Sequence, residues 1–90
     1  MLLELSKIAY EFKQVFRFDD VGHLIVVPEK MIQFCNPHNR FYLSLIGSVE
    51  IPELQFSGDE KKVRIQAIQI YGLCYAALLK FASIAKEHQI

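Results

Sequence analysis

Residues 65 to 79 form a stretch of fifteen positions without one charged side chain, IQAIQIYGLCYAALL. A helix that spans a bilayer needs about 20 predominantly apolar residues. This run is shorter, and Gln66 and Gln69 interrupt it. We therefore expect no membrane as a partner, and a helix that packs against protein on most of its surface.

The flanking residues extend this stretch into one long helix. Ser57-Gly58-Asp59-Glu60 fits a capping box, in which serine and glutamate side chains satisfy the free amides at a helix start. The apolar pattern continues to about His88. About 30 residues at 1.5 Å each give a rod about 45 Å long, whereas a compact domain of this size is only about 30 Å across. The helix must overhang its own domain or break at Gly72.

Apolar side chains surround this helix more widely than one packing face requires. One stripe follows three- and four-residue spacing: Val63, Ala67, Ile70, Cys74, Leu78, Phe81 and Ala85. A second set widens it: Ile68, Tyr71, Tyr75, Leu79 and Ala82. Ile65 and Ile84 extend the apolar cover around the flank. The small residues Gly72, Ala76 and Ala77 take the remaining side. Because a surface helix needs an apolar arc of only about 100°, we expect one side to cover its own domain and another to meet a partner, its twin.

The rest of the chain predicts one α+β domain over residues 1–90. Apolar residues recur with helical spacing over roughly residues 2 to 13. The period then changes to that of strands, because β-branched and aromatic runs are separated by turn residues. The pattern predicts four antiparallel strands in meander order, at residues 15–18, 23–27, 31–35 and 40–51, followed by the long carboxy-terminal helix packed on the sheet. The connecting turns are expected at 19–22, 28–30 and 36–39.

Alternation along these strands defines two faces. The predicted core face carries Phe16, Phe18, Leu24, Val26, Ile32, Phe34, Tyr42 and Ile46. The opposite face carries Val15, Arg17, Ile25, Val27, Met31, Gln33, Cys35, Phe41, Leu43 and Leu45, which is too apolar for ordinary exposure. From this face and the long helix we predict an interaction surface of Ile25, Val27, Phe41, Leu43, Leu45, Tyr71, Tyr75 and Leu78.

Composition favours assembly over catalysis. The chain has 90 residues, of which 52% are apolar, and a small domain has little interior in which to bury them. The surplus indicates a homodimer, or a complex with an unidentified protein. Ten basic and ten acidic residues cancel, so nucleic acid is not an expected partner. Glu4 interrupts the first apolar run, which lacks the pattern of a secretory signal and indicates a cytoplasmic location.

The segment Cys35-Asn36-Pro37-His38 is the one local grouping that suggests chemistry. The predicted hairpin brings His23 to the same end of the sheet, and thiolate and imidazole are both zinc ligands. A small-molecule or metal-binding domain using His23, Cys35 and His38 is therefore the second hypothesis. The competing interpretation is that the cysteines are reduced and buried, and that the histidine belongs to a turn. No convergent polar set predicts an enzyme, and no cofactor is expected.

Single-strand nucleic-acid binding is the third hypothesis. Arg17 lies between two phenylalanines, and Arg40 precedes Phe41 and Tyr42, an interleaving of charge and stacking rings that single-strand binders use. The other charged groups have simpler interpretations. The pair Asp19-Asp20 fits a turn, and the basic cluster at residues 61–64 fits a solvated helix end.

The run FDDVGH, the segment RFYLSLIGSVEIPE and the helix before them resemble the amino-terminal half of class I chaperones of type III secretion. Tyr42, Gly47, Ile51 and Pro52 match the family's pattern, and the resemblance covers residues 1 to 56. The chain is shorter than these proteins, neutral where they are acidic, and lacks their later strands. The resemblance implies a chaperone-like dimer that binds an extended protein segment along apolar grooves. Together these observations predict a non-enzymatic, homodimeric adaptor, regulator or chaperone-like module.

Overall fold

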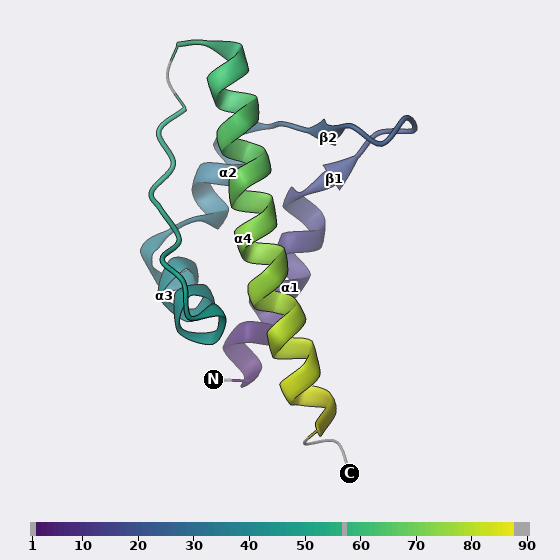
Figure 1. Cartoon of the computed structure of the whole chain (residues 1–90), viewed down its shortest axis with the longest axis vertical. Helices are drawn as coiled ribbons and strands as arrows, with labels where there is room; N and C mark the ends of the chain where they lie inside the picture. Colours follow the sequence, from purple (N-terminus) through teal and green to yellow (C-terminus); the bar gives the residue numbers. More distant parts are fainter. Residues whose placement is uncertain (1, 57, 88–90) are drawn as a thin grey trace.

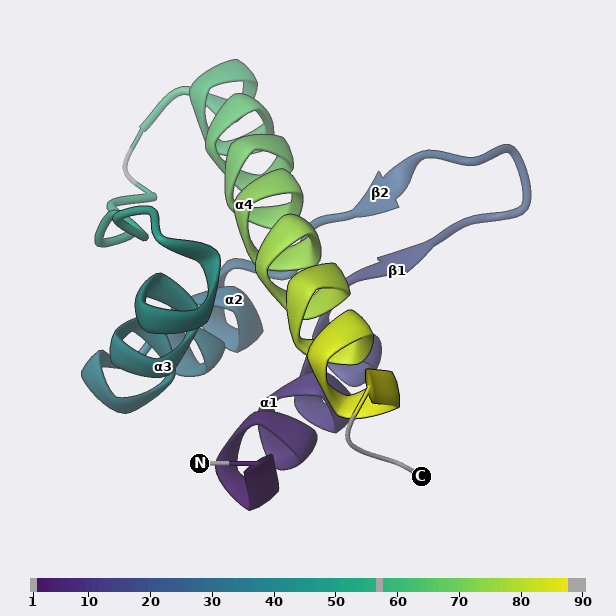
Figure 2. The same ribbon diagram turned by 60° about the horizontal axis from the view of Figure 1, so that its bottom comes forward.

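The computed structural model, which describes residues 2–56 and 58–87, is built around one long helix, α4 (Figure 1). In chain order the elements are α1 (Leu2–Val15), β1 (Arg17–Phe18), β2 (Leu24–Ile25), α2 (Pro28–Phe34), α3 (Pro37–Gly47) and α4 (Glu60–Glu87). Helix α3 and the β1–β2 hairpin lie on opposite sides of α4 in both views (Figures 1 and 2). The molecule measures 47 × 29 × 17 Å, so α4 alone sets its longest dimension.

Helix α4 is continuous for 28 residues, and Gly72 does not break it. Asp59 begins it, because its side-chain Oδ1 accepts the backbone N–H of Lys61 at 2.9 Å and its carbonyl accepts that of Val63 at 3.1 Å. This is an aspartate N-cap: its side chain satisfies one of the free amides of the first turn, and its carbonyl accepts the first hydrogen bond within the helix. Ser57 and His88, the predicted start of the capping box and the predicted end of the helix, lie outside the described residues.

One stripe of α4 is buried, and it agrees closely with the sequence pattern: Ala67, Ile70, Cys74, Ala77 and Phe81. Ala77 is the exception, because we expected it on the uncovered side. It lies against Gly47 at the end of α3, where a Cβ added to that glycine would come within 3.0 Å of the Ala77 Cβ. Two small residues thus allow α3 and α4 to approach closely, and α3 contacts α4 more extensively than any other element does.

The predicted four-stranded meander is wrong. Within residues 2–56 and 58–87 the sheet consists of the first hairpin alone, in which Arg17 pairs with Ile25 and Phe18 with Leu24. The predicted third strand is helix α2, and most of the predicted fourth is helix α3. Only after Ser48, which ends α3 in the left-handed conformation with φ of 51°, does the chain become extended.

The hairpin turn has the chemistry that its sequence predicts. The Asp19 carboxylate accepts the backbone N–H groups of Val21 and His23 at 3.0 and 2.8 Å. The hydrogen bond from the His23 amide is the main reason that the pKa of Asp19 lies below its ordinary value. Gly22 has φ of +86°, a conformation that side chains other than glycine's adopt only with strain.

The two lost strands are helices because residues that we assigned to turns begin helices instead. Pro28 and Pro37 each occupy the first turn of a helix, where the missing N–H costs nothing and the fixed φ is favourable. Asn36 caps α3, with its Oδ1 accepting the backbone N–H of Asn39 at 2.9 Å. The same Asn-Pro pair is compatible with a turn between strands, so its local chemistry alone could not distinguish a turn from the start of a helix.

The change from strand to helix redistributes the predicted core. Phe16, Leu24 and Phe34 are buried as expected, but Phe18 and Ile32 are exposed. Three residues that we placed on the opposite, half-covered face are buried instead: Met31, Cys35 and Leu43. Within α2 the buried residues are Met31 and Phe34, whose spacing of three shares a face in a helix but not in a strand.

Aromatic rings close the core between α1, α2 and α4. The ring of Phe12 stacks on those of Phe16 and Tyr71, with centroids 4.9 and 5.6 Å apart. The Phe34 ring meets Phe16 edge-on at 5.5 Å. Such pairs add about 0.5 to 1.5 kcal/mol each beyond the area that they bury, and they fix α4 across the other two helices.

Adjacent residues of α2 test the helical assignment. Met31 is fully buried and Ile32 is 47% exposed, the reverse of the strand prediction. We expect Met31→Ala to lower the free energy of unfolding by about 2 to 5 kcal/mol, as for other buried large-to-small changes. Ile32→Ala is the matched control and should change it by no more than about 0.5 kcal/mol. Urea unfolding followed by circular dichroism measures both, and a larger loss for Ile32→Ala would contradict the helix.

Candidate functional site

The side of α4 that faces away from its own domain carries an apolar surface, which we call the outer face of α4: Ile65, Ile68, Gly72, Tyr75 and Leu79. All five are exposed, and the four large side chains retain about half of their accessible surface. Their spacing of three, four, three and four residues is that of the seam of a coiled coil. At 1.5 Å per residue the outer face is about 21 Å long.

The outer face is separate from the surface that holds the domain together. At about 100° per residue, its centre lies about 160° around the helix from the buried stripe. Polar exposed residues such as Gln69 and Lys80 lie to one side of it. An isolated soluble domain normally presents charged and polar residues opposite its buried stripe, so an apolar seam at this position indicates an interaction surface.

Two grooves flank the outer face of α4. One, of about 650 Å³, runs between α4 and the segment that follows α3; Glu50, Pro52, Ile68, Gln69, Gly72 and Leu73 line it. The other, of about 310 Å³, lies between α4 and α1; Ala9, Phe12, Lys13, Tyr75, Leu78, Leu79, Phe81 and Ala82 line it. The lining of the second groove is apolar apart from Lys13 and the Tyr75 hydroxyl. The two grooves are therefore depressions beside the outer face of α4, one toward each end of it.

The predicted interaction residues do not form one surface. Leu43 is fully buried and can contact no partner, which corrects its assignment. Phe41 and Leu45 are exposed on α3, whereas Ile25 is exposed on the hairpin across α4. Val27 precedes α2 and is partly covered. The remaining three, Tyr71, Tyr75 and Leu78, lie on α4, and of these three Tyr75 alone is exposed. The sheet that was to unite them does not exist, so only the α4 members adjoin the outer face.

The residues of the metal hypothesis are also separated. His23 lies in the hairpin turn and His38 on α3, on opposite sides of α4, while Cys35 is buried beside Cys74. Among the residues that the structure describes, no three histidine, cysteine, aspartate or glutamate side chains are grouped to hold a metal ion. A shared site for His23, Cys35 and His38 therefore has no geometric support.

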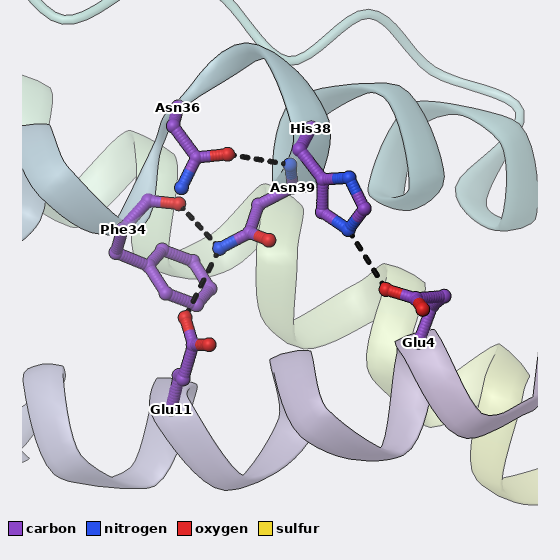
Figure 3. Close-up of polar contacts among 6 residues, drawn as sticks. All are labelled: Glu4, Glu11, Phe34, Asn36, His38 and Asn39. Carbon is purple, nitrogen blue, oxygen red and sulfur yellow. Dashed lines mark hydrogen bonds and ion pairs between the residues drawn. The ribbon is translucent and has the colours of Figure 1, made fainter.

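The segment Asn36–Asn39 has a structural role (Figure 3). Asn39 is a buried polar residue, and its Nδ2 donates to the Phe34 carbonyl at 2.7 Å and to Glu11 Oε2 at 3.2 Å. These bonds satisfy the end of α2 and connect it to α1. At the neighbouring position, His38 Nε2 lies 2.9 Å from Glu4 Oε2 and makes a second connection to α1 on the surface.

The arginines of the nucleic-acid hypothesis do not form a common surface. Arg40 donates from Nε to the Ile51 carbonyl at 3.0 Å, so it supports the chain after α3. Arg17 lies in the hairpin on the other side of α4. In the basic cluster, Arg64 donates to the Leu24 carbonyl at 3.5 Å and ties α4 to the hairpin.

Helix α4 is also long and apolar enough to cross a membrane, by length and composition. One third of its most apolar window is buried against the rest of the domain. That buried share faces α1 and α3, so the free surface of the helix amounts to the outer face and its edges.

No family model, curated protein or solved structure matches the chain.

The sequence pattern identified several residues of the outer face, but it did not identify the outer face as a separate surface. It placed Ile68, Tyr75 and Leu79 at the edges of one broad stripe, and Ile65 on the flank. The signal that would have found the seam is its own three-four spacing, which runs through Gly72. A glycine carries no side chain, so a count of large apolar residues breaks the pattern at that position.

The asparagine network gives a prediction that distinguishes its two asparagines. We expect Asn39→Asp to destabilise the protein by about 3 kcal/mol or more, because a buried carboxylate would face Glu11 and the Phe34 carbonyl. Asn36→Asp is the control and should cost less than about 1 kcal/mol, since aspartate is an equally good N-cap. Adding Glu11→Gln to Asn39→Asp should restore part of the loss. Urea midpoints measure these effects, and equal costs at the two positions would contradict the network.

Proposed function

We propose that this protein is a non-enzymatic protein–protein interaction module that forms a homodimer by packing together the outer faces of two α4 helices. The observation that carries the proposal is the exposed apolar seam of Ile65, Ile68, Gly72, Tyr75 and Leu79, opposite the buried stripe. Fully burying a large apolar side chain contributes about 1.5 to 3 kcal/mol, and within the monomer these side chains, which are about half exposed, make only part of that contribution.

A second copy is the occupant that fits the seam, because the seam is complementary to itself. In an antiparallel pair, two of the contacts set a large residue against a small one, Ile65 opposite Ala82 and Tyr75 opposite Gly72, and the third sets Ile68 against Leu79. Gly72 has nothing within 4 Å of an added Cβ, so it leaves room for a ring from the other copy. Repeating each contact by two-fold symmetry closes the assembly at two chains.

The two flanking grooves support the same arrangement. One groove adjoins the first half of the seam and the other adjoins the second half, on the opposite flank. A second α4 that crosses the first at an angle therefore meets a depression at each end. Its Tyr75 and Leu79 would approach the groove beside Gly72, and its Ile65 would approach the groove beside Leu79. This is the ridges-into-grooves packing of helices.

Charge favours the antiparallel orientation over the parallel one. A parallel pair would place the basic residues Lys61, Lys62 and Arg64 of each copy beside the same residues of the other. An antiparallel pair separates the two basic clusters, but it places each toward the opposite end of the second helix, where Lys80 and Lys86 lie as well as Glu87. The favourable antiparallel contribution is therefore the alignment of the two helix dipoles. Since the charged side chains are exposed, they add little affinity.

A partner protein in addition to the second copy is the less specific part of the proposal. The resemblance to type III secretion chaperones implies such a partner, and it remains a prediction. The segment that carries it, from Arg40 to Gly47, lies in α3 and not in a strand. Phe41 and Leu45 remain exposed on α3, away from the outer face, and are available to a second protein while the dimer is intact.

Matched isoleucine substitutions test the dimer. Ile68 on the outer face is 53% exposed and Ile32 on α2 is 47% exposed, so a glutamate at either position is tolerated by the fold. We expect the wild-type chain and Ile32→Glu to sediment as dimers at micromolar concentration. Ile68→Glu should sediment at the monomer mass of 10.4 kDa, because the dimer would bury two carboxylates against leucine.

Two results would contradict the proposal: a wild-type monomer at these concentrations, or a dimer that Ile68→Glu leaves intact while Ile32→Glu disrupts it. Circular dichroism on each variant verifies that the helices are retained. Recovery of the wild-type chain with vesicles instead of in the soluble fraction would assign the outer face to a lipid surface.

Spin labels test the orientation. In the antiparallel dimer, labels at position 62 of the two copies are separated by about 35 Å along the helix axis, whereas labels at position 76 lie within about 15 Å. A parallel dimer gives short distances at both positions. Lys62→Cys and Ala76→Cys introduce the label sites, which are both exposed, while the two native cysteines are buried. Pulsed electron–electron double resonance measures the distances, and a short distance between the labels at position 62 would contradict the antiparallel arrangement.

A further inference from the structure

Another hollow lies between α1, α2 and the first strand of the hairpin, and we call it the α1–α2 pocket. Its volume is about 400 Å³. The residues that line it are Tyr10, Glu11, Gln14, Val15, Arg17, Lys30, Gln33 and Phe34. None of them belongs to α4, so the pocket is separate from the outer face. Small-molecule sites commonly have volumes of about 300 to 1,000 Å³, and the pocket falls within this range.

Helical spacing turns polar side chains of α1 and α2 toward the pocket. On α1, Tyr10 and Gln14 are four residues apart. On α2, Lys30 and Gln33 are three residues apart. Residues at these spacings share one side of a helix. Because the two helices pack against each other, their polar sides form two walls of one pocket.

The hairpin supplies the third wall, because strand pairing directs Arg17 away from α4. Arg17 pairs with Ile25, and the next residue, Phe18, meets the Tyr71 ring of α4 edge-on at 5.2 Å. Neighbouring residues of a strand point to opposite faces. Phe18 therefore points toward α4, and Arg17 points toward the α1–α2 pocket, which it lines.

The pocket contains two cations whose charge the protein leaves uncompensated. Among residues 2–56 and 58–87, ion pairs are made by two histidines alone, and so neither by Arg17 nor by Lys30. The one carboxylate that lines the pocket belongs to Glu11, and it accepts a hydrogen bond from Asn39 Nδ2 at 3.2 Å. The positive charge of the pocket is therefore available to an anion that enters it.

We propose that the α1–α2 pocket binds a small phosphate monoester, with Arg17 and Lys30 holding the phosphate. A phosphate monoester carries about −1.5 to −2 charges near neutral pH and has three acceptor oxygens, which match the two cations. The planar guanidinium of Arg17 can donate two parallel hydrogen bonds to one phosphate, and the Lys30 ammonium adds a point charge. The amide groups of Gln14 and Gln33 are neutral donors for the remaining oxygen.

The rest of the pocket has room for the organic group that the phosphate carries. Tyr10 is 68% exposed and presents its ring at the pocket, beside the aliphatic side chain of Val15. An aromatic ring can stack on the Tyr10 ring. Phenyl phosphate, a monoester with a single ring, is therefore the probe that matches both halves of the pocket. Phenyl sulfate has the same ring and only one negative charge, so it is the matched control compound.

The experiment is an NMR titration of the full wild-type chain, labelled with nitrogen-15, with phenyl phosphate near neutral pH. We expect saturable shifts in the signals of Gln14, Arg17, Lys30 and Gln33, and none in the outer face of α4. Phenyl sulfate should bind at least about threefold more weakly, because it loses part of the attraction to the two cations. Phenol, which is neutral, should leave the signals of the pocket in place.

Three variants test the roles of the charges. Arg17→Gln should weaken the binding of phenyl phosphate about tenfold, because it removes a charge-assisted hydrogen bond. Lys62→Gln removes an equal charge from an exposed position of α4 outside the pocket, and it should weaken binding by less than about twofold. Glu11→Gln should tighten binding about threefold, because it removes the repulsion and keeps an acceptor for Asn39.

Three outcomes would overturn the proposal. The first is the absence of saturable shifts at phenyl phosphate concentrations up to about 10 mM. The second is equal weakening by Arg17→Gln and Lys62→Gln, which would show a diffuse attraction to positive charge. The third is displacement of phenyl phosphate by a lower concentration of single-stranded oligothymidine, which would assign the pocket to a nucleic-acid backbone. Because no residue of α4 lines the pocket, failure of this site and failure of the dimer are separate results.

Discussion

The packing of α4 against α1 and α3 is the interaction on which the rest of the structure depends. Its buried stripe runs from Ala67 to Phe81, and along it small residues alternate with large ones. Ala77 admits the end of α3 at Gly47, while the Phe81 and Ile70 side chains fill the wider spaces. Because a helix has only one circumference, this packing also determines which residues face away. The outer face of α4 is a consequence of how the inner side is covered.

The sequence predicted those parts of the fold in which local and long-range signals agree. The first and last helices and the first hairpin have one period each, and Asp19 and Gly22 fit no alternative. The middle of the chain failed because its signals are ambiguous: proline and asparagine begin helices as readily as they form turns. β-branched and aromatic residues favour strands only weakly. The helical outcome is seen in the burial of Met31 with Phe34 in α2 and of Asn39 with Leu43 in α3, at spacings of three and four, and this burial depends on tertiary contacts.

The candidate site shows the same division between what a pattern contains and what only packing reveals. The excess of apolar surface on α4 was predictable from its composition. The side of α4 that would remain exposed was not predictable. We expected Ala77 on the uncovered side, but it is buried; we placed Ile65 on the flank, but it lies in the outer face.

The buried stripe and the outer face of α4 lie on opposite sides of one helix, so changes on the two sides have different effects. The buried stripe determines whether α4 exists as an ordered helix, since a helix within a protein owes most of its stability to tertiary packing. In the proposed dimer, the outer face determines only what that helix binds. A change in the buried stripe therefore weakens both the fold and the seam, because an α4 that frays loses its three-four spacing. A change in the outer face would weaken the proposed assembly alone.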